Sequence, residues 1–375
     1  METEAFAIAF SERLQAEAIK EVSLKIKLIF PKKIDYLIIL STPDYHPANI
    51  LKTVNLTLKP RRILGIQSPF LIFEDKLITK GIVVCCINKE GVEFTEAFSK
   101  ATGAQEIESF LISSFKKLRR QDYAFFSFIS SQIDPTAYLR GVRLALGRFF
   151  ELLGCGFTKK YSYHNSQIIN NAPNEGLMNI AIKGLRVRSL RLGGYVPLGK
   201  PFTITKTTPN RDVIIEINHQ PAINIYQHYL EEKFDLFIKN HLFAFYPLGI
   251  STGGSLRLIN ILDRLEDGSL ICRGEAREGG IGYVMFLDAA VPLERLKDKL
   301  APLRNNRQGL TFVINSLTRK KTLGESAKQE IVSIKKTLGD NSKVIGLYTD
   351  YSFVSDKETG NIDIETGNLL ITTWE

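Results

Sequence analysis

The stretch "ELLGCGFTKKYSY" (151–163) contains residue types that nucleophilic chemistry requires. Cys155 lies between two glycines, and Tyr161, Tyr163 and His164 follow it in a polar segment. A cysteine attacks when a neighbouring base removes its proton, so a hydrolase that pairs Cys155 with His164 is one interpretation. The other two interpretations are a small residue at a glycine-flanked turn and a residue that lines a ligand site. The spacing alone leaves all three open.

A second set of side chains has the types that bind a small ligand carrying both charges, such as an amino acid. Such a site needs a cation for the carboxylate and an acid for the ammonium group, and Arg257 and Asp350 could supply them. Tyrosines offer apolar walls together with a hydroxyl group. No residue of the set is assigned a catalytic role. The candidate ligand-binding residues are Ser68, Cys155, Tyr195, Tyr246, Arg257, Tyr348 and Asp350.

The sequence lacks the patterns of metal sites, secretion signals and membrane spans. The 4 cysteines include no C-x-x-C and the 5 histidines no H-E-x-x-H, so we expect neither a metal site nor a cofactor. Scattered cysteines are typical of proteins from a reducing compartment. The N-terminus lacks the basic and apolar regions of a secretory signal, and no apolar run approaches the ~18 residues of a membrane span. We therefore expect a cytoplasmic protein with no membrane partner.

The chain is basic, with a formal net charge of +9. A basic protein can bind an acidic partner such as nucleic acid. However, the lysines and arginines occur singly or in short pairs, and 40 acidic residues are interleaved with them. We therefore do not expect a nucleic-acid partner. Salt-sensitive retention on a polyanion would be the sign of one.

Three segments of the chain repeat one order of elements: strand, helix, strand, strand. The first unit has expected strands at 34–40, 62–66 and 81–88 and a helix at 47–58. The second has strands at 121–129, 151–156 and 176–184 and a helix at 135–150, with Asp134 as its N-cap and Pro135 at its first position. The third has strands at 309–315 and 343–353, a helix at 323–339 and a final hairpin at 360–374.

The second strand of each unit reaches a glycine and continues into a polar, aromatic loop. The three stretches read "ILGIQSPF", "LLGCGFTKKYSY" and "VIGLYTDYSF". Cys155 is then equivalent to Ile66 and Leu347, neither of which can attack a substrate. Because ligands of α/β sheets bind beyond the carboxyl ends of strands, we expect the site among these loops. Whether the three loops converge on one pocket is left open by the pattern.

Several segments, taken in order, resemble FIST proteins. They are "DYLIILSTPDY", "RILGIQSPF", "GYVPLGKPFTITKT", "VIIEINHQPAINIYQHYL", "YPLGI" and "LRLINILDRLEDGSLICRGEAREG". The resemblance implies a cytoplasmic sensory region of bacterial signalling that binds small ligands such as amino acids. It also implies an N-terminal FIST-like domain at 1–217 and a C-terminal one at 218–375. The chain departs from the family at Ile66-Gln67, where a small Cys or Ser is frequent, and at "LYTDYSF", where Tyr-x-Tyr-Gly-Glu is frequent.

The predicted fold class is α/β, with two lobes of mixed sheets packed with helices and built from repeated β-α-β-hairpin units. Stacked αββα layers of the kind seen in Ntn hydrolases are the alternative. The predicted function is a non-enzymatic module that senses a small ligand. Because no output domain follows residue 375, we expect it to act through a separate signalling partner. A hydrolase-like enzyme that uses Cys155 is the alternative function.

Overall fold

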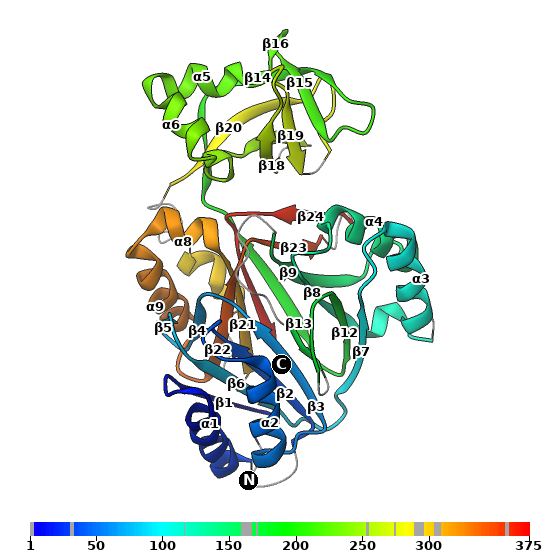
Figure 1. Ribbon diagram of the computed structural model, residues 1–375, viewed down its shortest axis with the longest axis vertical. Helices are drawn as coiled ribbons and strands as arrows, with labels where there is room; N and C mark the ends of the chain where they lie inside the picture. The colour runs from blue at the N-terminus through cyan, green and yellow to red at the C-terminus, as the bar shows by residue number, and fades with distance from the viewer. Residues whose placement is uncertain are drawn as a thin grey trace.

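The computed structural model describes residues 4–30, 34–115, 117–158, 167–169, 172–252, 255–273, 275–288, 296–303, 309–356 and 360–375. The chain forms a large body and a smaller lobe at one end of it (Figure 1). Helices and strands alternate through the body, as the predicted α/β class requires. The prediction of two lobes of mixed sheets packed with helices is confirmed.

The body contains three units of one topology. The first consists of β1 (Phe6–Ser11), α1 (Gln15–Ile29), β2 (Tyr36–Ser41), α2 (Pro47–Thr57), β3 (Arg62–Gln67) and β6 (Ile82–Ile87). Strand β2 is parallel to β3 and antiparallel to β6, and β6 pairs with β1. The predicted strands at 34–40, 62–66 and 81–88 and the helix at 47–58 are confirmed, whereas β1 and α1 were not predicted.

The second unit repeats this order, and the third has the same pattern of strand pairing. The second consists of β7 (Glu93–Ser99), α3 (Ala104–Phe115), β8 (Ala124–Ile129), α4 (Pro135–Leu146), β9 (Glu151–Gly156) and β12 (Leu177–Lys183). The third consists of β13 (Val187–Leu192), β21 (Gly309–Ser316), α8 (Leu317–Leu323), α9 (Ser326–Leu338), β22 (Ser342–Thr349) and β25 (Leu369–Trp374). Asp134 caps α4 as predicted, because its carboxylate accepts from the N–H groups of Thr136 and Ala137.

The units exchange hairpins in a closed cycle. The hairpin β4 (Leu71–Phe73) and β5 (Lys76–Ile78) of the first unit extends the sheet of the third by pairing with β22. The hairpin β23 (Tyr351–Ser355) and β24 (Ile362–Glu365) of the third extends the second by pairing with β9. The hairpin β10 (Gln167–Ile169) and β11 (Ala172–Asn174) of the second extends the first by pairing with β3. Each body sheet therefore has 6 strands drawn from two units.

The predicted equivalence of the three glycine-containing strands is confirmed by their register. Gly65 lies opposite Ile39, Gly154 opposite Ser127 and Gly346 opposite Val313. A Cβ at Gly346 would lie 2.1 Å from the Val313 carbonyl oxygen. A Cβ at Gly154 would lie 2.4 Å from the ring of Phe353 on the exchanged strand. Glycine therefore permits a close approach at these two positions.

The inner faces of the three sheets share one hydrophobic core, which contains Ile66, Cys155 and Leu347. Helices cover the outer faces, for example α1 and α2 over the first sheet. Cys85 belongs to the inner core and Cys86 to the core under α1 and α2, as strand alternation predicts. Because three sheets enclose the inner core, the fold differs from the alternative of stacked αββα layers.

The smaller lobe is inserted between β13 and β21 of the third unit. Its strands are β14 (Tyr195–Thr207), β15 (Val213–Ile217), β16 (Gln220–Pro221), β17 (Leu248–Thr252), β18 (Ser255–Arg264), β19 (Leu270–Arg273) and β20 (Ile281–Leu287). Pairing of β14 with both β20 and β15 closes the sheet on itself, and α5 (Asn224–Leu230) and α6 (Phe234–Lys239) lie beside it. Residue 217 lies at the end of β15, within the smaller lobe, and the chain returns to the body after β20.

Substitution Gly346→Ala is expected to lower the free energy of unfolding by about 2–3 kcal/mol, because the added methyl group meets backbone that cannot move aside. Gly103→Ala is the matched control, since the nearest atom to its Cβ would be 3.8 Å away. Urea denaturation of both variants measures the difference. Equal stability of the two variants would contradict the close approach at β22.

Candidate functional site

The ends of the three glycine-containing strands meet in the structure. The Ser68 hydroxyl donates to the carbonyl oxygen of Tyr348 at 2.7 Å, which joins the first and third units. The Asp350 carboxylate accepts from the Thr158 N–H at 2.7 Å and from the Thr158 hydroxyl at 3.1 Å, which joins the third and second units. We call Ser68, Thr158, Tyr348 and Asp350 the strand-end cluster. The ends of these strands therefore converge among the described residues, a point that the sequence pattern left open.

Asp350 is the ionisable centre of this cluster. Only 6% of the residue is exposed, and burial raises the pKa of its carboxyl group to about 6. The hydrogen bonds from Thr158 and the positive charges of Arg273 and Lys321 act in the opposite direction and limit the rise. The carboxyl group therefore changes its charge near pH 6, and a shifted pKa of this kind is frequent at functional sites.

Arg273 brings a charge from the smaller lobe to this site. It ends β19, and its guanidinium carbon lies 5.3 Å from the centroid of the Tyr351 ring. The buried Nε of Arg273 and the buried hydroxyl of Tyr351 have no hydrogen-bond partner among the described residues. Buried polar groups are normally satisfied, so these two groups need an explanation, as does the buried and unsatisfied hydroxyl of Tyr348.

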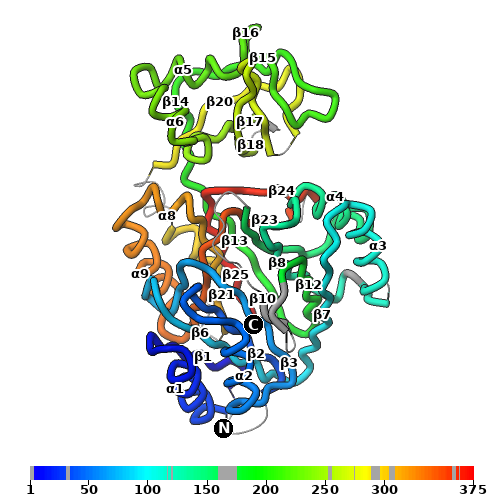
Figure 2. Tube along the Cα trace, viewed as in Figure 1, coloured from blue at the N-terminus to red at the C-terminus, as the bar shows by residue number. Residues whose placement is uncertain are grey.

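The smaller lobe also contacts the body through Asn260 on β18. Its side-chain amide donates to the carbonyl oxygen of Ile364 at 3.5 Å, and its oxygen accepts from the Thr366 hydroxyl. Ile364 lies on β24, and Figure 2 shows the smaller lobe beside β23 and β24. Asn260 pairs directly with Arg273 across β18 and β19, so both face the body.

A buried ion pair supports the cluster from the helix side. Arg319 and Glu330 are each 0% exposed, and the Arg319 Nη2 donates to the Glu330 carboxylate at 2.5 Å. The Arg319 Nη1 also donates to the carbonyl oxygens of Gly193 and Gly367, at 3.4 and 3.5 Å. Burial, followed by the charge of Glu330, raises the pKa of Tyr348 well above its ordinary value. Sequence reasoning missed this pair, because Arg319 follows β21, whereas the site was expected in the loops that follow β3, β9 and β22.

The structure brings together only part of the predicted set. Ser68, Tyr348 and Asp350 lie in the strand-end cluster, and Cys155 lies in β9 just before it. Tyr195 begins β14 next to the ion pair, since a Cβ at Gly367 would lie 1.9 Å from its hydroxyl. The remaining two candidates, Tyr246 and Arg257, lie within the smaller lobe.

Arg257 does not face the strand-end cluster. It lies three positions before Asn260 on β18, and residues an odd number apart on a strand face opposite ways. Its face is shared with Ile259 and Ile261 of the smaller lobe's core, and its guanidinium donates to the carbonyl oxygen of Glu275. The Tyr246 carbonyl accepts from the Tyr226 hydroxyl at 2.7 Å in the same lobe. The cations that act on Asp350 are therefore Arg273 and Lys321, and Arg257 is not among them.

Cys155 has the environment of a packing residue. It is 1% exposed in the inner core, and burial raises the pKa of its thiol far above the ordinary value, which disfavours the reactive thiolate. Its equivalents Ile66 and Leu347 occupy the same core. Tyr161, Tyr163 and His164, the residues considered as its partners, lie outside the described part of the chain.

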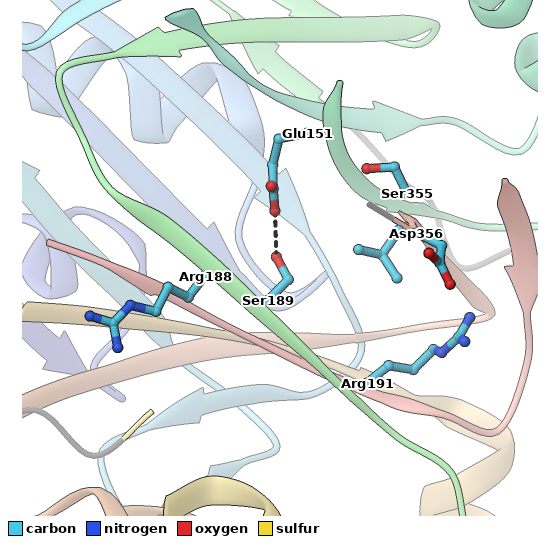
Figure 3. Close-up of a pocket in the computed structure, with 7 residues that line it drawn as sticks. Glu151, Arg188, Ser189, Arg191, Ser355 and Asp356 are labelled. Atoms are coloured by element: carbon cyan, nitrogen blue, oxygen red, sulfur yellow. Dashed lines mark hydrogen bonds between the residues drawn. The ribbon is translucent and has the colours of Figure 1, made fainter. Parts of the chain in front are cut away.

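A separate cavity of about 300 Å³ lies between β13, β9 and β23 (Figure 3). Its arginines are already neutralised: Arg191 pairs with Glu365 at 2.6 Å, and Arg188 pairs with Glu375 at 3.3 Å. Ser189 donates to Glu151 at 3.3 Å across the cavity. None of the predicted site residues lines it; the lining residues are Glu151, Arg188, Ser189, Arg191, Val354, Ser355 and Asp356.

Comparison with known proteins identifies family regions over most of the chain. The FIST N domain matches residues 35–220 and the FIST C domain matches residues 222–350, which confirms the resemblance. A search of curated proteins gives no match. Two solved structures show weak similarity to this chain. Cyanuric acid hydrolase from A. caulinodans has 7% identity and a TM-score of 0.37, with 98% of each chain covered. PurLQS from Thermotoga maritima has 10% identity and a TM-score of 0.20, with 98% of this chain and 72% of that chain covered. Scores this low carry no argument about function.

The raised pKa of Asp350 predicts a pH-dependent difference in stability between the protein and its Asp350→Asn variant. Because the folded state favours the protonated carboxyl, the stabilisation from Asp350 is complete below the ordinary pKa of 3.8 and is lost as pH rises through about 6. Relative to the variant, the protein should lose about 3 kcal/mol of unfolding free energy across that interval. Urea denaturation at several pH values measures this loss. A constant difference between the two proteins would contradict the burial of Asp350.

Proposed function

Because the chain belongs to the FIST family, whose domains are sensory domains of signal transduction, we propose that it senses a small ligand at the strand-end cluster. The observation that carries the proposal is the unsatisfied pair next to Asp350. The Arg273 Nε and the Tyr351 hydroxyl are buried without hydrogen-bond partners in the described residues. A ligand that meets both groups removes the cost of leaving them unsatisfied.

The ligand that fits these groups is an amino acid or a similar small zwitterion. Its carboxylate binds the Arg273 guanidinium and the Tyr351 hydroxyl, both of which donate hydrogen bonds. Its ammonium group binds Asp350, whose carboxyl then titrates at a lower pH because a cation favours the charged form. The pairing that we expected of Arg257 and Asp350 is thus assigned to Arg273 and Asp350.

Signalling would follow from the position of the site between the two lobes. Asp350 belongs to the body and Arg273 to the smaller lobe, and β18 contacts the body through Asn260. A ligand that binds both charges stabilises the arrangement in which the lobes are held together. The proposed output is recognition of that arrangement by a separate signalling protein.

The same reasoning favours a receptor over an enzyme. FIST domains are sensory, and the burial of Cys155 supports packing rather than attack. A cytoplasmic setting belongs to the proposal, and the four free cysteines are consistent with it. None of the helices in the described residues has the length and apolar composition that crossing a bilayer requires.

Thermal unfolding against a panel of amino acids, small carboxylates and nucleotides tests the proposal. A ligand of the folded state at about 100 times its Kd adds about 2.7 kcal/mol of stability, which shifts the midpoint by a couple of degrees or more. We expect this shift with one or more amino acids. Arg273→Met should abolish it, because the methionine keeps much of the side-chain volume and removes the donors.

Arg257→Met is the matched control, since it removes an arginine of the same lobe that faces away from the site. It should leave the shift intact. An amino-acid shift that survives Arg273→Met but is lost in Arg257→Met would contradict the assignment of the site. A panel that produces no shift at all would contradict the ligand class.

A further inference from the structure

Leucine and lysine side chains alternate on the outer face of α1. Ala18, Ile19, Val22 and Ile26 of this helix are buried, whereas Leu24 and Leu28 are 66% and 86% exposed. Lys20 and Lys27 are exposed on the same stripe, because residues three, four or seven positions apart share a helix face. Glu17 and Glu21 lie on this stripe too, and Glu21 is paired with Lys25 and Arg13. The outer face of α1 therefore combines exposed leucines with charges among which the basic ones are in excess.

The neighbouring helix α2 has the same character. Its inner residues Ile50, Leu51 and Val54 are buried, whereas Lys52 is exposed and Leu56 is 69% exposed. Leu56 lies one turn after Lys52, so the two share the outer face of α2. The helix contains no acidic residue.

The two outer faces form one surface. Gln15 at the start of α1 accepts from Asn49 near the start of α2 at 2.8 Å, and Ser23 lies 2.9 Å from Thr57 near the end of α2. The helices are therefore parallel neighbours that cover one side of the first sheet, and their outer faces point away from it together. Figure 1 shows both helices at the end of the molecule opposite the smaller lobe. We call Lys20, Leu24, Lys27, Leu28, Lys52 and Leu56 the leucine–lysine face.

The charge of this part of the chain selects an anionic partner. Residues 13–29 and 47–59 contain six basic side chains and two acidic ones, which gives +6 − 2 = +4. One of the two acids, Glu21, is already paired with Lys25 at 2.7 Å and with Arg13 at 3.2 Å. Lys20, Lys27 and Lys52 have no ion-pair partner within the described ranges, so their charges are available to a partner.

We propose that the leucine–lysine face docks reversibly on an anionic lipid surface. The leucines enter the boundary between head groups and acyl chains, and the lysines lie against the negative head groups. Nucleic acid accounts for the lysines but leaves the exposed leucines without a function, since phosphates offer them no apolar contact. The expectation of no membrane partner came from the absence of a spanning segment, a criterion that does not address helices lying on a surface.

Sedimentation with vesicles tests this docking on the full chain. We expect binding to vesicles of phosphatidylcholine with about a quarter phosphatidylserine, little binding to phosphatidylcholine alone, and weaker binding as salt rises. The double variant Lys20→Glu/Lys27→Glu should weaken binding by about tenfold or more. Leu24→Ser/Leu28→Ser should weaken it by about tenfold as well, because the variant lacks the two apolar side chains that enter the boundary between head groups and acyl chains.

Two substitutions on the smaller lobe are the matched controls. Leu236 is 59% exposed and Lys239 is exposed, so Leu236→Ser and Lys239→Glu change similar side chains at the opposite end of the molecule. Both should leave vesicle binding unchanged. All the altered side chains are exposed, and unchanged thermal unfolding confirms that the variants fold.

Three results would overturn the proposal. The first is absence of binding to phosphatidylserine vesicles at low salt, which is the outcome expected if the face docks a protein instead. The second is full vesicle binding by the leucine variant, which would show that binding comes from the positive charge of the chain and not from the leucines. The third is an equal loss in the smaller-lobe controls.

Discussion

The structure depends on the closed exchange of hairpins among its three units. Each sheet of the body is completed by a hairpin from another unit: β4 pairs with β22, β23 pairs with β9, and β10 pairs with β3. This exchange brings the ends of β3, β9 and β22 to one place, and Gly154 and Gly346 permit a close approach in β9 and β22. The strand-end cluster is a consequence, because Ser68 meets Tyr348 and Asp350 meets Thr158 where neighbouring units join.

The smaller lobe adds the positive charge of Arg273 at this junction between the units of the body. Within the body, Ser68 bonds to backbone and Arg319 is matched by Glu330, whereas the buried hydroxyls of Tyr348 and Tyr351 have no hydrogen-bond partner among the described residues. The Nε of Arg273 is likewise buried without a partner in these residues, and the charge of Arg273 acts on Asp350. The ion pair of Arg319 also holds Gly193 and Gly367, which lie where the chain leaves β13 and enters β25. A buried, satisfied pair of this kind fixes geometry more than it adds stability.

Local sequence patterns predicted the repeated core of the fold and part of the site. The Asp134-Pro135 start of α4, the opposite faces of Cys85 and Cys86 and the equivalence of Gly65, Gly154 and Gly346 were all readable from neighbouring residues. The hairpin exchange was not, because it joins residues such as Ser68 and Tyr348 that are 280 positions apart. Arg273 was missed for a related reason: which arginine faces the body depends on strand register, and β18 and β19 pair with a shift between Ile261 and Asp263 that periodicity does not reveal.

The central claim is that a small ligand binds where the smaller lobe meets the strand ends. Hydrogen–deuterium exchange with and without an amino acid that stabilises the protein tests it most directly. The account predicts protection of two separate regions at once, around residues 347–352 of the body and around residues 270–273 of β19. Protection confined to the cavity lined by β13 and β9, or confined to one lobe, would contradict it.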